Sequence, residues 1–289
     1  MTSLSLSQGS QEWLDFRRAK IGASDVPIIM KASPWSSPFE LWQIKTGKKP
    51  EKDMSVAMAR GVRLEPLARK AAESHFKIPL EPDVQISNDT DWAIASLDAI
   101  SIDGDVLVEI KCPGEKNHLE TIETKEVPRH YQIQCQWQMY VTGLQFMYYM
   151  SFSEESYEII ELKRNDVLIH ELVTKAYEFY LCVINNIPPA ASSEDRLFIN
   201  DEAFIIREME YVKLKKLYDD SNKNLKTARA ALLECTDDGN CEGNLLKITW
   251  SKPKETIDYK KLISDLKISD EVLSKYRKTS LSFPTISIK

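Results

Sequence analysis

The fold of this chain follows from the stretch Ile94-Ala-Ser-Leu-Asp98-Ala-Ile-Ser-Ile-Asp-Gly104-Asp-Val-Leu-Val-Glu109-Ile-Lys111-Cys-Pro113. Its apolar runs predict two strands joined by a turn at Gly104, and Pro113 ends the second because proline cannot donate to a sheet ladder. Residues two apart on a strand point to the same face. Glu109 and Lys111 therefore project together, and a hairpin brings Asp98 beside them.

These three side chains predict hydrolysis of a phosphodiester. Two carboxylates form a hard, oxygen-rich site that suits Mg²⁺ or Mn²⁺. The lysine supplies positive charge where a phosphate and an attacking water meet. The same spacing is also found in exposed hairpins with scattered charges. The apolar run around Glu109 argues against that reading, because a carboxylate in a buried strand is costly unless it is paired or bound to metal.

The signature formed by Asp98, Glu109 and Lys111 resembles that of the PD-(D/E)xK nucleases, and in detail that of the YqaJ-type, lambda-exonuclease-like viral recombinases. Three further motifs follow the order of that family, over roughly residues 10–190. They are Trp13-Leu-Asp-Phe-Arg17-Arg-Ala-Lys-Ile-Gly22-Ala-Ser24, Arg60-Gly61-Val-Arg-Leu-Glu65 and Tyr131-Gln-Ile-Gln134-Cys-Gln136-Trp-Gln-Met-Tyr. One position departs from the pattern, since Leu97 stands where many members have proline.

The resemblance implies a metal site. Asp98, Glu109 and the backbone carbonyl of Ile110 would bind one or two Mg²⁺ ions, for which Mn²⁺ could substitute. Glu65, on the helix predicted over about 54–76, would reach the metal directly or through water. An ordinary alternative for Glu65 is a helix charge that pairs with Arg69 four residues later.

Arg17 and Ser24 flank a turn between two predicted helices. Ser24 with Asp25 is typical of a helix N-cap, and the N–H groups of a helix start bind anions. An arginine adds a planar, bidentate donor for phosphate. Arg18 competes with Arg17, but the seven-residue step from Arg17 to Ser24 fits the family. The resemblance implies that this pocket holds the 5′-phosphate of a DNA end, with help from Ser96, Gln134 and Tyr131.

Composition limits the class of protein. A chain of 289 residues with 43% hydrophobic residues can bury one sizeable core and a smaller appended unit. No run reaches the length of a membrane helix, and the N-terminus lacks the pattern of a signal peptide. Five cysteines without metal-type pairs indicate a reducing cytoplasm, and the resemblance implies a phage or prophage protein in a bacterial host cell. The net charge of −6 argues against a general DNA binder, although bound metal offsets clustered carboxylates.

The order of the predicted elements indicates an α/β fold: a restriction-endonuclease-like core with a mixed central sheet flanked by helices. Strands are expected near residues 84–87, 92–96, 106–111, 145–152 and 157–162, and further helices over 128–142 and 166–186. The run Pro188-Pro-Ala-Ala-Ser-Ser predicts a boundary between a nuclease core, residues 1–190, and a C-terminal extension, residues 191–289. The extension should hold a helix with an apolar stripe over 202–235 and short strands over 245–251 and 285–289, for packing, oligomer or partner contacts.

The function favoured by the motifs is a 5′-to-3′ exonuclease that digests double-stranded DNA from its ends and leaves 3′ overhangs. The resemblance implies a trimeric ring and a single-strand annealing partner in recombination. An endonuclease that cuts internally or at branched DNA is the chief alternative, and it would need no terminal-phosphate pocket. A non-catalytic protein that binds DNA ends is a second. An acidic scaffold without a DNA role fits the net charge but leaves the ordered motifs unexplained.

Overall fold

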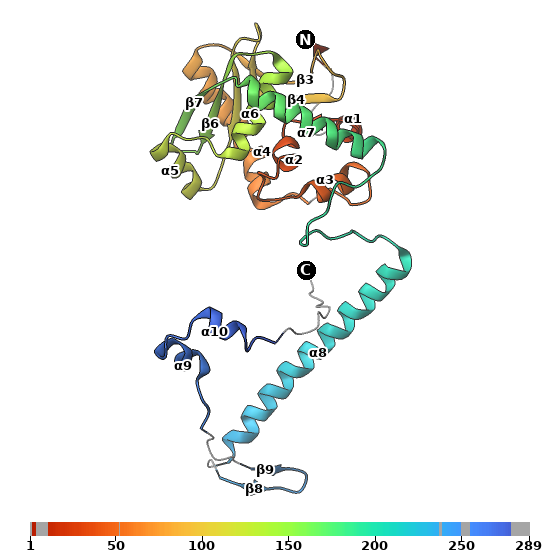
Figure 1. The fold of residues 1–289 in the computed structure, drawn as a ribbon, viewed down its shortest axis with the longest axis vertical. Coiled ribbons are helices and arrows are strands. Elements are labelled where there is room, and N and C mark those ends of the chain that lie inside the picture. The colour runs from red at the N-terminus through yellow and green to blue at the C-terminus, as the bar shows by residue number, and fades with distance from the viewer. Residues whose placement is uncertain (1, 4–10, 52, 237–238, 250–254, 279–289) are drawn as a thin grey trace. The chain divides into compact units, whose positions relative to one another are not determined.

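The computed structural model describes residues 2–3, 11–51, 53–236, 239–249 and 255–278. It divides the chain into two compact units, Met1–Asn200 and Asp201–Lys289 (Figure 1). The first unit holds every residue that the sequence assigned to a site. Each unit is described separately.

A mixed sheet forms the centre of the first unit, with the strand order β1-β3-β4-β5-β6-β7 and with β2 beside β4. Strands β5 and β6 are parallel, as are β2 and β4, and the other pairs are antiparallel. The α/β class and the mixed sheet expected from the sequence are confirmed. The strands are β1 (Thr2–Ser3), β2 (Ile21–Gly22), β3 (Leu80–Ile86), β4 (Ala93–Ser101), β5 (Leu107–Lys111), β6 (Phe146–Phe152) and β7 (Tyr157–Lys163).

Helices cover both faces of this sheet (Figure 1). On one face α6 and α7 pack over Leu97 and Leu107, around the fully buried Trp137. On the other face α4 packs over Val108 and Ile110, which follows from the alternation of side chains along β5. The helices are α1 (Gln11–Arg18), α2 (Val26–Ile29), α3 (Pro38–Lys45), α4 (Val56–Phe76), α5 (Glu115–Thr124), α6 (Arg129–Thr142) and α7 (Asp166–Ile184).

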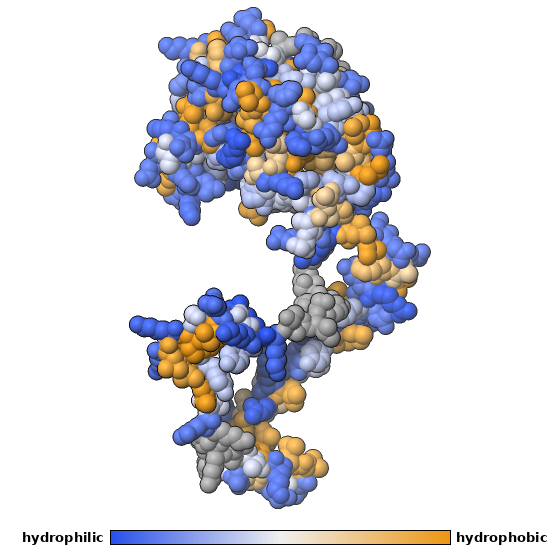
Figure 2. Space-filling model, viewed as in Figure 1, coloured by the Kyte–Doolittle hydropathy of each residue, from blue (hydrophilic) through white to orange (hydrophobic). Residues whose placement is uncertain are grey.

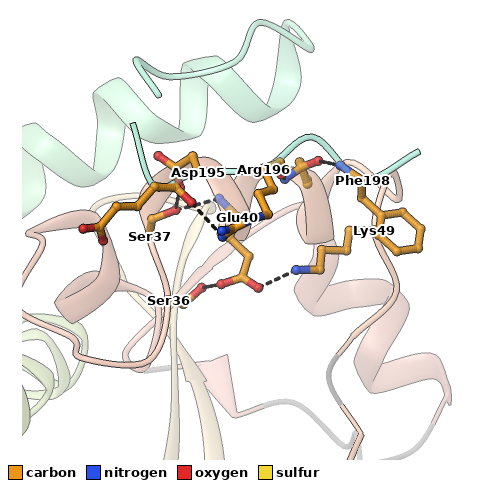
Figure 3. A network of polar contacts seen from close by, with 9 residues as sticks. Ser36, Ser37, Glu40, Lys49, Asp195, Arg196 and Phe198 are labelled. Carbon is orange, nitrogen blue, oxygen red and sulfur yellow. Dashed lines mark hydrogen bonds and ion pairs between the residues drawn. The ribbon is translucent and has the colours of Figure 1, made fainter. Parts of the chain in front are cut away.

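The segment before the second unit is fixed to α3 (Figure 3). Ser37, the N-cap of α3, binds the carboxylate of Asp195. The buried amide of Gln43 donates to the carbonyl of Arg196 at 2.9 Å and accepts from the N–H of Phe198 at 2.7 Å. These contacts keep residues 191–200 with the first unit, so the division falls after Asn200 rather than at the expected residue 190.

The second unit begins with the 33-residue helix α8 (Glu202–Glu234). It continues with a two-stranded hairpin, β8 (Cys241–Glu242) and β9 (Lys247–Ile248), and with the short helices α9 (Tyr259–Asp265) and α10 (Asp270–Ser274). The strand expected over residues 285–289 lies outside the described residues. Among the residues that the structure describes, none of the helices combines the length and the apolar character needed to cross a lipid bilayer.

Candidate nuclease site

The first part of the site lies where β4 and β5 separate. Their antiparallel ladder joins Ala99 to Val108 and Ile100 to Leu107, so Asp98 and Glu109 would form the next pair. At this point the Asp98 carboxylate accepts a hydrogen bond from the backbone N–H of Ile110 at 2.9 Å. A side chain thus takes the place of a strand partner, and the two carboxylates meet beyond the end of the ladder.

Glu109 is the most enclosed residue of this group, with 1% of its surface exposed. The amide of Gln134 donates to one carboxylate oxygen, and that of Gln138 to the other, each at 2.5 Å. The ammonium group of Lys111 forms an ion pair with the same carboxylate. Because α6 presents both glutamines toward β5, the carboxylate is held in one orientation by neutral donors and one cation.

Strands β4 and β5 bring two carboxyl groups, Asp98 and Glu109, close to one lysine, Lys111. Burial and the nearby charge of Glu109 raise the pKa of Asp98 to about 8, against the opposing effects of Lys111 and the Ile110 N–H. Burial would lower the pKa of Lys111, but the charges of Glu109 and Asp98 raise it. Lys111 therefore stays protonated, while two carboxylates compete for it.

Glu65 lies on α4 beside this pair. Its carboxylate binds Arg69 at 2.5 Å, which is the expected contact four residues along the helix. Arg69 in turn donates to the backbone carbonyl of Asp98 at 2.7 Å, and the negative charge of Glu65 adds to the raised pKa of Asp98. Glu65 therefore forms the ordinary helix ion pair with Arg69 and also lies next to the carboxyl groups of the site.

A cavity of about 430 Å³ opens beside Lys111. It gathers most of the residues expected to bind a 5′-phosphate, and the guanidinium of Arg17 donates to the hydroxyl of Ser24 at 2.7 Å. Ser96 does not line this cavity; its backbone carbonyl accepts from Gln138 at 3.2 Å. Of the expected residues, the cavity wall contains Arg17, Ser24, Lys111, Tyr131 and Gln134, together with Arg18.

The helix N-cap expected from Ser24 and Asp25 is confirmed in position only, since Asp25 is the N-cap residue of α2. Helix α2 has four residues, and Asp25 at its start makes no capping bond. Asp25 is instead buried, with its carboxylate 2.8 Å from the ammonium of Lys45, and it accepts from the N–H of Gly22 at 2.7 Å. Burial would raise the pKa of Asp25, but Lys45 and Arg17 lower it. The start of α2 therefore holds a buried carboxylate, which opposes the binding of an anion there.

The first unit of the chain is similar to known proteins. The model of one family, described as the YqaJ-like viral recombinase domain, matches the part of the chain from α1 to the end of α6. Residues 12–145 are similar to the YqaJ-like viral recombinase domain. The resemblance expected from the four motifs is thereby confirmed.

The YqaJ-like domain has relatives of known sequence and structure. The uncharacterized protein YqaJ of Bacillus subtilis (strain 168) is 29% identical over 175 residues, which are 58% of this chain and 54% of that protein. The chain thus spans about half the length of this curated relative. The alkaline exonuclease LHK-Exo from Laribacter hongkongensis is 29% identical, with a TM-score of 0.54 over 62% of this chain and 94% of that one. LHK-Exo in complex with dAMP gives 28% identity and the same TM-score and coverage.

Two residues of the YqaJ-like domain belong to the site although the sequence did not assign them to it. Gln138 binds Glu109, and its spacing of four from Gln134 on a helix was the available signal. Lys45 neutralises Asp25 across 20 residues of chain, and no local pattern indicates that contact. Both residues orient charged groups that line the site.

The strand ends of the YqaJ-like domain offer oxygen donors to a metal. Within the described ranges, no three His, Cys, Asp or Glu side chains are grouped as a metal site. The ligand set would therefore combine Asp98 and Glu109 with a backbone carbonyl and water. The Ile110 N–H points to β4, and in a strand the carbonyl of the same residue points to the same side. This set of hard donors fits Mg²⁺.

Proposed function

We propose that this protein is a metal-dependent deoxyribonuclease that digests double-stranded DNA from its ends, in the 5′-to-3′ direction, and leaves 3′ overhangs. One observation carries the proposal: Lys111 belongs to both parts of the site. It pairs with the Glu109 carboxylate, and it lines the cavity that contains Arg17 and Ser24. A terminal phosphate in that cavity would lie next to the carboxylates.

The residues have distinct roles in the proposed reaction. Asp98, Glu109 and the carbonyl of Ile110 would hold Mg²⁺, with Glu65 assisting; Mn²⁺ would substitute. When bound, the metal supplies an activated water and neutralises charge that develops on the phosphate. Lys111 would orient the attacking water or offset charge on the phosphate, while Gln134 and Gln138 keep the Glu109 carboxylate oriented.

The terminal phosphate would be held by the cavity residues. Arg17 offers a planar pair of donors and Ser24 a hydroxyl, both of which suit a phosphate dianion. Gln134 borders the cavity as well as Glu109, so it connects the two parts of the site. The relation to an alkaline exonuclease supports this choice over cutting within a strand.

The assembly and partners are proposals of the same kind. The resemblance to lambda-exonuclease-like enzymes supports a homo-oligomeric ring of three and a single-strand annealing protein that receives the 3′ overhang. All five cysteines are free thiols in the structure, which suits action in the reducing cytoplasm of a bacterial host.

The test is digestion of three DNAs in Mg²⁺: linear duplex with 5′-phosphate, the same duplex with 5′-hydroxyl, and a covalently closed circle. Rapid loss of only the phosphorylated linear duplex is the expected result. Cutting of the circle would make the protein an endonuclease. Metal-independent binding of ends without digestion would make it a non-catalytic end binder. Lys111→Ala should abolish digestion while the protein still binds DNA, and full activity in this variant would overturn the proposal.

A further inference from the structure

Helix α8 has an apolar face that no described residue of its own unit covers. None of its residues is buried, and five large side chains on one face are between 39% and 66% exposed. Figure 2 shows apolar residues along this helix. They recur at intervals of seven residues: Phe204, Tyr211, Tyr218, Leu225 and Leu232.

A seven-residue apolar repeat is typical of helices that wind around another helix. The row three residues further along completes the seam of such a pair, because positions a and d of a heptad face the partner. This second row is mostly small or apolar and consists of Arg207, Leu214, Ser221, Ala228 and Cys235. The seam runs the full length of α8, about 50 Å.

We propose that α8 pairs with α8 of a second copy of this chain in antiparallel orientation. A parallel pair would set each residue against its own copy, so that two Arg207 side chains meet and the tyrosine rings face one another. An antiparallel pair sets large residues against small ones, which lets the layers interlock. In that register, Tyr211 meets Ala228 of the other copy and Tyr218 meets Ser221.

The flanking charges fit the same register. Glu208 and Arg229 occupy the position beside the seam near opposite ends of α8, and both are exposed. An antiparallel pair brings Glu208 of one copy next to Arg229 of the other, and the two-fold symmetry repeats this contact. Opposite charges beside a seam set the orientation of helix pairs. A second copy therefore covers the apolar row of α8 and pairs the charged residues beside it.

The first experiment measures the molar mass of the full chain by sedimentation equilibrium. A two-fold contact predicts an even multiple of the 33.2 kDa chain, whether or not the nuclease units also form a ring. Leu225→Glu should halve this mass, while Thr227→Glu, the same charge on the outer face, should leave it unchanged. A monomeric or trimeric wild type, or an unchanged mass in Leu225→Glu, would overturn the proposal. Nuclease activity, measured separately, tests the proposed function independently.

The second experiment fixes the orientation without depending on a disruptive charge. Tyr211→Cys and Ala228→Cys are introduced singly and together, in a chain with Cys235→Ser and Cys241→Ser. Residues 211 and 228 are about 25 Å apart along one helix, too far for a disulfide within a chain. Oxidation should link chains covalently in the double variant only. Cross-linking of both single variants would show a parallel pair, and no cross-linking in any variant would exclude the contact.

Discussion

The side chain of Asp98 accepts a hydrogen bond from the backbone N–H of Ile110 at 2.9 Å, where the ladder between β4 and β5 ends. The bond holds the Asp98 carboxyl group in place beside Glu109. Burial and the charge of Glu109 therefore oppose the ionisation of Asp98, and Lys111 is the cation nearest to both carboxyl groups. A divalent ion would offset the charge of Glu109 and allow Asp98 to ionise.

The stability of the metal-free protein should fall as pH rises toward 8. The folded-state pKa of Asp98, about 8, is above the ordinary value of 3.8. Between these values the folded state binds more protons than the unfolded state, so the free energy of unfolding decreases with rising pH. Urea unfolding in EDTA from pH 5 to pH 9 measures this slope. Asp98→Asn should flatten it and abolish digestion, and an equal slope in wild type and variant would contradict the assignment.

Gln138→Leu should reduce digestion by about 10- to 100-fold, because residues that orient a metal ligand commonly contribute this much to affinity or activity. The change removes the hydrogen bond to Glu109 but keeps the volume of the side chain. Gln132→Leu is the matched control on the same helix, since its amide donates to the carbonyl of Val127 rather than to a carboxylate of the site. The measurement is the rate of digestion against Mg²⁺ concentration. Equal effects of the two changes would indicate that Gln138 has a packing role only.

Arg17→Ala should remove the preference for a 5′-phosphate. A hydrogen bond to a charged group contributes about 1.5–3 kcal/mol, so the ratio of rates on 5′-phosphate and 5′-hydroxyl duplexes should fall by about 10- to 100-fold. Arg18→Ala is the control, because Arg18 lines the same cavity, whereas Arg17 donates to the hydroxyl of Ser24. If Arg18→Ala removes the preference instead, Arg18 rather than Arg17 contacts the phosphate.

Lys45→Met should destabilise the protein by about 3–5 kcal/mol, because it leaves the buried carboxylate of Asp25 without its cation. Lys45 has 5% of its side chain exposed and lies 2.8 Å from Asp25. Lys49→Met removes a pair with Glu40 whose lysine is 26% exposed, and it should cost about 1 kcal/mol or less. Chemical denaturation compares the two. A small effect in Lys45→Met would mean that Arg17 alone sustains the charge of Asp25.

The sequence was sufficient for features that depend on local periodicity. Alternation along a strand places Glu109 and Lys111 on one face and Ile110 on the other. Periodic apolar residues predicted α4, α6, α7 and α8 within two residues at each end, and four motifs in order gave the family. Short elements such as β2 and α5 were missed, because two to ten residues carry too little pattern to distinguish them from loops.

Contacts between distant parts of the chain came from the fold alone. Lys45 meets Asp25, and Gln43 binds the backbone near residue 197, more than 150 residues later; the second contact moves the division between the units to Asn200. The buried carboxylate of Asp25 pairs with the cation that packing brings within reach. The buried amide of Gln43 likewise binds the backbone groups that packing places beside it. A repeating pattern of apolar residues encodes which face of an element is buried, whereas the partner of a buried polar group depends on how the elements are stacked.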